Sequence, residues 1–313
     1  MKTKEMKIAV VGTGVIGASW AACFLAKGYD VAATDPAAGA EDRLRVLVDS
    51  YWPMLQTMGL ADGASPSRLS FHADVAHAVS NAGFIQESGP ERVDIKRETL
   101  AQIDAAAPVD ALIATSSSGI RISDIQDAAK HPERVLLGHP FNPPHLIPLV
   151  EVLGGRLTSQ QAIDQAMLFY ASLGKKPIHI RREVKGHVAN RLQAALWREA
   201  FHLVQEGVAS VSDIDTAIAH GPGLRWALLG PFINLHLSGG EGGIKHMLEH
   251  LGPPMEEWWA DLGQVKLSPQ LNQELVAGVD QELQGTNLQE MVDQRNQVLL
   301  ALLQMKEQAT RLP

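Results

Sequence analysis

The feature that most constrains the fold of this chain is segment 6–35, which reads MKIAVVGTGVIGASWAACFLAKGYDVAATD. An apolar run leads into a glycine-rich turn, a helix-like segment, a second apolar run and a final acid. Gly12, Gly14 and Gly17 have the spacing that permits a tight turn, a close backbone approach to a pyrophosphate, and packing of a helix on a strand. The segment therefore predicts a βαβ unit that binds a dinucleotide, rather than a parallel-sheet unit that binds none.

The acid at the end of this segment bears on which dinucleotide binds. Asp35 follows Gly17 by 18 residues, where a carboxylate accepts hydrogen bonds from an adenosine ribose. The same carboxylate would repel a ribose 2′-phosphate, so we expect NAD rather than NADP. Val15 and Ile16 begin the helix and are expected to lie against the cofactor together with the three glycines.

Length and composition set the class of protein. The 313 residues are enough for about two domains. A formal net charge of -8, without a basic cluster, argues against a nucleic-acid surface. The one cysteine, Cys23, lies in the first helix pattern, which fits a buried thiol in a reducing compartment. Because we find neither a signal-peptide pattern nor a run long enough to span a membrane, we expect a cytoplasmic protein without membrane contact.

Strand and helix patterns alternate up to about residue 185. Apolar runs predict strands at 30–34, 82–86, 111–115, 134–137 and 177–180, and helical spacing predicts helices at 41–58, 92–106 and 159–173. Residues 62–70 are rich in turn formers. The alternation predicts that residues 1–185 form a doubly wound α/β domain, with a mostly parallel sheet covered on both faces.

Polar residues follow two of these strands, at the edge where such sheets bind ligands. Ser116, Ser117 and Ser118 follow the strand 111–115, and His139 follows the strand 134–137. Taken singly, a serine here can be a cap and a histidine structural. Glu151, however, interrupts an apolar run 12 residues after His139, and a carboxylate in a buried strand needs a cationic or hydrogen-bonding partner. The proline-rich segment between them must turn, which would bring Glu151 to His139.

From Gly186 onward the patterns are helical, which predicts an all-α domain over residues 186–313. An apolar stripe is expected to face a core, and its members are Val188, Leu192, Ala195, Leu196, Leu203 and Val204. Asn190 lies off this stripe, with Trp197 and Phe201 on roughly its own face. On helix statistics alone, the two aromatics are core residues and Asn190 is a surface residue.

The remaining helical patterns have fewer local markers. Ser212 and Asp215 match a capping box, which makes Asp215 structural. Further helices are predicted at about 231–250 and 270–306.

Several of these segments together resemble the 3-hydroxyacyl-CoA dehydrogenase superfamily. They are segment 6–35, Glu91 with Lys96, TSSS ending at Ser118, HPFNPPHLIPLVEV from His139, and GHVANRLQ from Gly186. The resemblance extends to about residue 231. It implies an N-terminal Rossmann domain, a helical C-terminal domain that forms a homodimer, and an active site in the cleft between them. It also implies that Glu91 and Lys96 contact the cofactor.

The resemblance assigns roles to four further residues. It makes His139 the catalytic base and Glu151 its partner, with Ser118 and Asn190 around the substrate oxygen. The chemistry agrees, because oxidising a secondary alcohol requires removal of its hydroxyl proton as hydride leaves for the nicotinamide, and imidazole does this near neutral pH. No metal is expected in this site.

Segment 221–231 departs from the pattern of the acyl-CoA enzymes. It is longer and holds Arg225 beside Trp226, and a guanidinium can grip a free carboxylate, which a thioester does not offer. The segment is similar to that of family members that act on L-carnitine or L-gulonate. The trimethylammonium of carnitine requires aromatic faces, which Trp197 and Trp226 would supply.

The expected substrate is therefore a small free 3-hydroxy acid, L-carnitine, with L-gulonate and a 3-hydroxyacyl-CoA as alternatives. A protein that binds NAD without turnover is the alternative from another class. Such a protein would not need Ser118, His139, Glu151 and Asn190 together.

Overall fold

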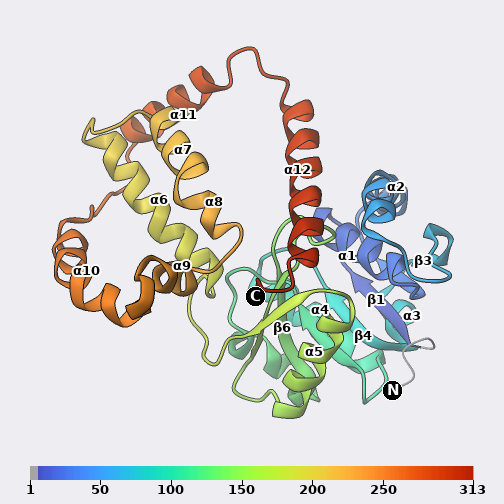
Figure 1. Ribbon diagram of the computed structural model, residues 1–313. Helices are drawn as coiled ribbons and strands as arrows, with labels where there is room; N and C mark the ends of the chain where they lie inside the picture. The colour runs from blue at the N-terminus through green and yellow to red at the C-terminus, as the bar shows by residue number, and fades with distance from the viewer. Residues whose placement is uncertain (1–5, 313) are drawn as a thin grey trace. The chain divides into compact units, whose positions relative to one another are not determined.

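The structure of the protein is a computed structural model that describes residues 6–312 (Figure 1). The chain divides into two compact units, Met1–Arg191 and Leu192–Pro313, and each is described by itself. The first unit holds the sheet, and the second is helical. The predicted fold class, an α/β domain followed by an all-α domain, is confirmed.

Eight strands form one sheet in the first unit. They are β1 (Lys7–Val11), β2 (Val31–Thr34), β3 (Leu69–His72), β4 (Ala82–Glu87), β5 (Leu112–Thr115), β6 (Val135–Pro140), β7 (Leu149–Gly154) and β8 (Lys176–His179). Their order is β3-β2-β1-β4-β5-β6-β7-β8, and neighbours are parallel except β6 and β7. The strand order reverses between β1 and β4, and in such sheets ligands bind at the carboxyl edge of this switch point.

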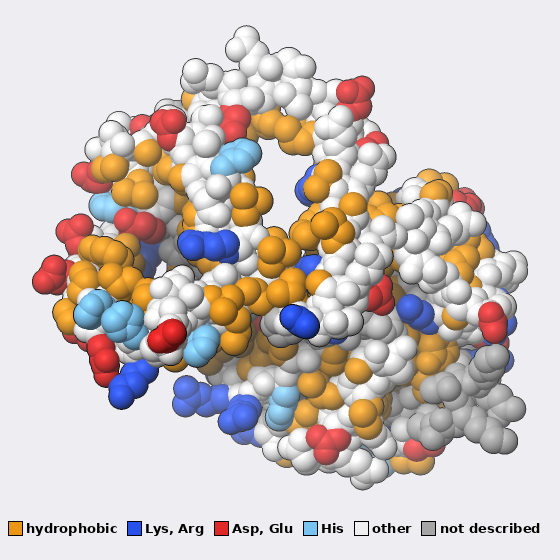
Figure 2. Space-filling view, in the orientation of Figure 1, with side chains coloured by type: hydrophobic (Ala, Val, Ile, Leu, Met, Phe, Trp, Pro, Cys, Tyr) orange, Lys and Arg blue, Asp and Glu red, His pale blue; other side chains and the backbone are white. Residues whose placement is uncertain are grey.

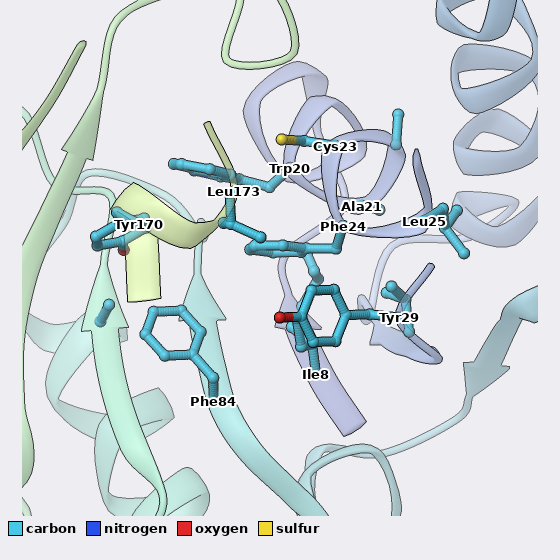
Figure 3. Packing of buried hydrophobic residues seen from close by; sticks show 14 of the residues in the cluster. Ile8, Trp20, Ala21, Cys23, Phe24, Leu25, Tyr29, Phe84, Tyr170 and Leu173 are labelled. Atoms are coloured by element: carbon cyan, nitrogen blue, oxygen red, sulfur yellow. The ribbon is translucent and has the colours of Figure 1, made fainter. Parts of the chain in front are cut away.

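Helices cover both faces of the sheet. They are α1 (Val15–Ala26), α2 (Ala40–Met58), α3 (Val75–Val79), α4 (Val93–Ala106) and α5 (Gln160–Ser172). Because side chains alternate along a strand, Ile8 enters one core with residues of α1, α2 and α5, whereas Ala9 enters a second core with residues of α3 and α4. Figure 3 shows the first core, where Trp20 stacks on Phe24 with ring centroids 5.4 Å apart. Cys23 is a buried free thiol in this core.

Two local predictions for the first unit are wrong. β6 continues past residue 137 to Pro140, so His139 lies within a strand and not after it. The reason is its antiparallel pairing with β7, which satisfies the backbone as far as Pro140. Residues 69–72 form β3 although segment 62–70 is rich in turn formers, because pairing with β2 holds them extended. The other strands and helices predicted from 30 to 180 are observed within one residue of their predicted ends.

The helices that follow are α6 to α12. Their bounds are Ala189–Gln205, Val211–His220, Pro222–Trp226, Pro231–Ser238, Gly243–Asp261, Pro269–Glu282 and Leu288–Gln308. α6 begins in the first unit and continues into the second. Within the second unit, α7 packs against α8 and α11, and α9 packs against α10 (Figure 1).

Three predictions for these helices are corrected. The helix predicted at 231–250 is interrupted between α9 and α10, where Gly240 and Gly243 have positive φ, and the helix predicted at 270–306 is interrupted near Gly285 for the same reason. The capping box of α7 is formed by Ser210 and Asp213. Since the helix begins two residues earlier than predicted, Asp215 lies inside it.

The apolar stripe of α6 does not face a core along most of its length. Val188, Leu192, Ala195 and Leu196 are exposed, Leu203 is half-buried, and Val204 is buried. Helical periodicity identifies an apolar face but does not say what covers it. Figure 2 likewise shows hydrophobic side chains at the surface of the helical unit.

Two sequence expectations concern membranes and the chain start. Across residues 6–312, no helix combines the length and apolar character that a bilayer span requires. The expectation that no signal peptide precedes the first strand falls on residues 1–5, which lie outside the described residues.

Candidate functional site

Gly12 and Gly14 lie between β1 and α1, and Gly17 lies in the first turn of α1. Each is a glycine for a different reason. Gly12 has a φ of +89°, and a Cβ on it would lie 2.7 Å from the Gly89 nitrogen. A Cβ on Gly17 would lie 1.9 Å from the Gly12 carbonyl oxygen. A Cβ on Gly14 would meet nothing within 4 Å. Gly12 and Gly17 are thus required by packing inside the protein, whereas Gly14 borders open space.

That open space lies at the N-terminus of α1. Gly14 and Val15 are exposed, and Ile16 is half-buried. No side chain caps the helix, so its first N–H groups are available to an anion such as a pyrophosphate. A chain turn with this shape and these donors fits the phosphates of a dinucleotide.

The acid expected to bind the ribose lies beside this turn. Asp35 follows β2 directly, and its carboxylate accepts hydrogen bonds from the N–H groups of Thr13 at 2.7 Å and Ala37 at 2.9 Å. These two bonds orient the carboxylate next to the glycine turn. Its position fits the adenosine end of NAD, although the contacts of single residues with the cofactor stay predictions.

Lys96 is held inside the protein rather than extended toward solvent. Its side chain is 1% exposed, and its Nζ lies 2.8 Å and 3.1 Å from the two carboxylate oxygens of Glu87. Nζ also donates to the Gly89 carbonyl at 3.3 Å, and Glu87 accepts from the Gly89 N–H at 2.6 Å. The buried ion pair therefore anchors the loop that packs against Gly12.

Glu91 lies at the end of the same loop. Its Oε1 accepts hydrogen bonds from Ser117 Oγ and the Gly119 N–H, both at 2.7 Å. Burial raises the pKa of Glu91, but these hydrogen bonds and the nearby Lys96 outweigh it, so its pKa lies below the ordinary value. Glu91 is an ionised group that joins the loop after β4 to the serine turn after β5.

His139 and Glu151 face each other across the antiparallel pair β6 and β7. Their Cα atoms are partners in the register, and His139 Nδ1 lies 2.8 Å from Glu151 Oε2. Glu151 is fully buried, and its Oε1 accepts from the N–H groups of Val188 and Ala189, both at 2.9 Å. The start of α6 thus helps to hold the carboxylate.

These contacts decide the protonation of the pair. Burial raises the pKa of Glu151, but hydrogen bonds from His139 and from the N–H groups of Ala189 and Val188 outweigh it, and the pKa lies below its ordinary value. An ionised carboxylate only accepts hydrogen bonds, so Nδ1 of His139 carries the proton. Nε2 is therefore the acceptor nitrogen, and it lies 3.2 Å from the Ser118 hydroxyl, which donates to it.

The three serines after β5 have three different partners. Ser116 Oγ accepts from the buried amide of Gln86 at 2.8 Å, Ser117 Oγ donates to Glu91 at 2.7 Å, and Ser118 Oγ contacts His139. Ser118 is thus the serine that the structure brings to the expected base.

Asn190 lies in the first turn of α6, directly after the two N–H groups that hold Glu151. It is half-buried, and within residues 6–312 its amide makes no hydrogen bond. The turn therefore places Asn190 in the same segment as the Glu151 cradle, with its donor group uncommitted.

The expected substrate residues belong to the second unit. Trp197 on α6 is 49% exposed and Trp226 at the end of α8 is 46% exposed, so neither is a core residue of the described chain. Phe201 is half-buried. Arg225 is exposed on α8, and its guanidinium has no ion-pair or hydrogen-bond partner among the described residues.

Sequence reasoning missed two buried residues of this site, Glu87 and His187. Glu87 ends the apolar strand β4, so the argument applied to Glu151, that an acid in a buried strand needs a partner, would have found it. His187 is 3% exposed and its ring centroid lies 5.1 Å from that of His139. No periodicity or spacing marks it in the sequence.

Comparisons with known proteins show the family to which the chain belongs. The family model described as 3-hydroxyacyl-CoA dehydrogenase, NAD binding domain, matches residues 7–184, and the model described as 3-hydroxyacyl-CoA dehydrogenase, C-terminal domain, matches residues 186–274. An L-carnitine dehydrogenase of Bacillus cereus is 47% identical over 306 residues, which cover 98% of this chain and 94% of that protein. An L-carnitine dehydrogenase of Streptomyces griseus is 50% identical, covering 95% of this chain and 89% of that protein.

Solved structures show the same relationship. The NAD+ dependent 5-formyl-3-hydroxy-2-methylpyridine 4-carboxylic acid 5-dehydrogenase is similar with a TM-score of 0.83 at 28% identity, covering 96% of this chain and 98% of that one. A 3-hydroxybutyryl-CoA dehydrogenase of Escherichia coli has a TM-score of 0.67 at 28% identity, covering 87% of this chain and 56% of that one. The chain therefore belongs to the 3-hydroxyacyl-CoA dehydrogenase family and is an NAD-dependent oxidoreductase.

Proposed function

We propose that this oxidoreductase oxidises the 3-hydroxyl of L-carnitine to give 3-dehydrocarnitine. The observation that carries the proposal is the contact of His139 with a buried, ionised Glu151, which makes His139 Nε2 the acceptor nitrogen, beside Ser118. The substrate is supported by the relatives named L-carnitine dehydrogenase, at 47% and 50% identity over nearly the whole chain.

The proposed reaction uses His139 as general base. Its Nε2 takes the proton of the substrate hydroxyl, and Glu151 stabilises the imidazolium that forms, as the third group does in a catalytic triad. NAD, when bound at the glycine turn, supplies the hydride acceptor. Because Glu151 is fixed by two backbone N–H groups as well as by His139, it holds the imidazole in one tautomer before the substrate arrives.

Ser118 and Asn190 are proposed to stabilise the reacting oxygen. Negative charge develops on this oxygen as the hydroxyl proton leaves, and each donor aimed at such a charge contributes roughly 3 kcal/mol in comparable sites. Ser118 Oγ lies next to the Nε2 that would take the proton. The uncommitted amide of Asn190 is available for the same purpose.

Carnitine carries two further charged groups, and residues of the second unit are proposed to bind them. The guanidinium of Arg225, unpaired among the described residues, suits the carboxylate. The exposed indoles of Trp197 and Trp226 suit the trimethylammonium, each aromatic face contributing about 0.5–2 kcal/mol.

We also propose roles for the two domains, a dimeric state and a cytoplasmic location. Residues 1–185 would bind NAD, and residues 186–313 would contribute to substrate binding and to a homodimer, which the exposed apolar face of α6 supports. Sedimentation of the purified protein tests the dimer. The single buried thiol of Cys23 is compatible with action in the cytoplasm.

The decisive experiment is a substrate comparison. Purified protein is mixed with NAD and either L-carnitine, L-gulonate or 3-hydroxybutyryl-CoA, and NADH absorbance is followed. We expect a kcat/KM for L-carnitine at least about 100-fold above the others, since only carnitine offers both charged groups. Oxidation of L-gulonate or the CoA ester without oxidation of carnitine would replace the proposed substrate, and NAD binding without any turnover would favour the binding-protein alternative.

The base is tested by His139→Ala. Turnover should fall by about 10²–10⁴-fold, because general base catalysis contributes that much, while the Kd of NAD stays near that of the unaltered protein. Equal activity in the variant would remove His139 from the mechanism.

A further inference from the structure

His187 occupies an unusual backbone position at the start of α6. It has a φ of +51° and is the one non-glycine residue with positive φ in the described chain, residues 6–312. Side chains with a Cβ rarely adopt this left-handed conformation. His187 immediately precedes Val188, whose N–H donates to Glu151, so the strained residue belongs to the turn that holds the carboxylate.

The ring of His187 is tied to the serine turn. Its Nε2 lies 3.2 Å from the carbonyl oxygen of Ser117, and because a carbonyl can only accept, Nε2 carries the proton. Ser117 directly precedes Ser118, which contacts His139. His187 therefore links the turn that presents Ser118 to the turn that presents N–H groups to Glu151.

The other ring nitrogen has no partner. Nδ1 of His187 is buried and makes no hydrogen bond within the described residues. A buried acceptor left unpaired destabilises the fold, as does left-handed backbone in a residue with a Cβ. An apolar residue at this position would leave no ring nitrogen unpaired, and a glycine would adopt this φ without strain. Such locally unfavourable features cluster at functional sites.

Its surroundings keep the ring neutral. Burial lowers the pKa of His187, and the neighbouring His139 lowers it further, whereas the Ser117 carbonyl, Glu151 and Glu91 oppose this. A neutral ring suits this place, because a second positive charge 5.1 Å from His139 would oppose the imidazolium that forms when the base takes a proton.

We propose that His187 is a positioning residue, which uses its Nε2–H to hold the Ser117 carbonyl and so keeps Ser118 in register with His139 and Glu151. This inference rests on the proposed role of His139 as base. It assigns to His187 no contact with substrate or cofactor.

Three substitutions test the inference through the identity of the donor atom. His187→Phe keeps the ring but removes the donor, and we expect kcat to fall at least about tenfold, with the KM for NAD unchanged. The thermal midpoint should stay near that of wild type, because the unpaired Nδ1 is removed while the Ser117 carbonyl loses its donor. His187→Gln carries an N–H at the same number of bonds from Cβ as Nε2, so kcat should return to within about threefold of wild type. His187→Asn places its N–H nearer to the Nδ1 position and should not rescue. His131→Phe, at an exposed histidine, is the control.

Two results would overturn the inference. One is a wild-type kcat in His187→Phe. The other is an equal kcat in His187→Gln and His187→Asn. This second comparison tests the inference even if His187→Phe does not fold. Histidine-labelled ¹⁵N NMR supplies a readout that needs no turnover. His187 should be neutral with its proton on Nε2, and the His139 Nε2 resonance should shift in His187→Phe and return in His187→Gln. A charged His187, or a proton on Nδ1, contradicts the inference even if the substrate proposal fails.

Discussion

The carboxylate of Glu151 offers a sharp test of the base, through the change Glu151→Gln. One oxygen of this buried group faces His139 Nδ1 at 2.8 Å, and the other accepts from the N–H groups of Val188 and Ala189 at 2.9 Å each. Glutamine keeps the volume but has one acceptor oxygen instead of two. That oxygen is expected on the side of the two backbone donors, so the amide NH₂ faces His139 Nδ1.

In this arrangement the glutamine NH₂ and His139 Nδ1–H are both donors and face each other, unless the His139 proton moves from Nδ1 to Nε2. In that tautomer Nε2 cannot accept the hydroxyl proton, and the base is lost. Returning to the active tautomer forfeits the hydrogen bond to the amide, about 1 kcal/mol, and the charged bond that the carboxylate provided is worth about 2–3 kcal/mol. The total of about 3–4 kcal/mol corresponds to a loss of about 10²–10³-fold in kcat.

Initial rates of NADH formation at saturating NAD and L-carnitine measure kcat, and a fluorescence titration measures the Kd of NAD. The Kd should be unchanged, because Glu151 bonds to His139 and to the backbone at the start of α6. Glu98→Gln, at an exposed carboxylate on α4, is the matched control, and thermal unfolding verifies the fold. A kcat for Glu151→Gln within about tenfold of wild type would refute the tautomer argument.

Further substitutions separate folding, cofactor binding and substrate binding. Gly14→Ala should keep the thermal midpoint, since its Cβ meets nothing within 4 Å, but should raise the Kd of NAD at least about tenfold by blocking the pyrophosphate. Gly17→Ala places a Cβ 1.9 Å from a backbone oxygen and should lower the free energy of unfolding by about 2–4 kcal/mol. Equal thermal midpoints for the two variants would contradict this reasoning. Burial lowers the pKa of His145 to about 4, so between about pH 4 and about pH 6.5 the unfolded chain binds a proton that the folded chain does not, and the unfolding free energy falls as the pH falls. Urea titrations should show a loss of about 2 kcal/mol from about pH 7 to about pH 5 that His145→Gln abolishes, and the same slope in both proteins would assign the proton elsewhere. Arg225→Ala should raise the KM for L-carnitine about 100-fold at nearly constant kcat, with Arg225→Lys intermediate; an unaltered KM would show that another residue holds the carboxylate.

Local patterns in the sequence were sufficient for the elements of the sheet unit. The glycine turn at the start of α1 could be predicted because two of its constraints, the positive φ of Gly12 and the close approach of Gly17 to the Gly12 carbonyl, arise within a few residues. The packing of Gly89 against Gly12 is a long-range contact that the local pattern does not contain. The strands and helices between residues 30 and 180 followed from periodicity for the same reason. Periodicity was a weaker guide in the helical unit, where glycines with positive φ such as Gly240 and Gly285 end helices that the apolar pattern would continue.

The candidate site could be predicted from the sequence less completely than the strands and helices of the sheet unit. The need of Glu151 for a partner could be read from a carboxylate in an apolar strand, and the sequence suggested His139 as that partner. The contact itself depends on the antiparallel register of β6 and β7, which extends β6 past its predicted end. A register joins residues through backbone pairing across the sheet, and no local pattern contains it.

Only the tertiary structure revealed the groups that support these residues. Lys96, expected near the cofactor, is paired with the buried Glu87 and anchors the loop against Gly12. His187 joins Ser117 to the turn that holds Glu151. The sequence by itself determined the dinucleotide turn and the residue types that the chemistry needs, because these depend on neighbours along the chain. The packing that orients them was decided in three dimensions, because each supporting contact joins residues brought together only by the folded sheet.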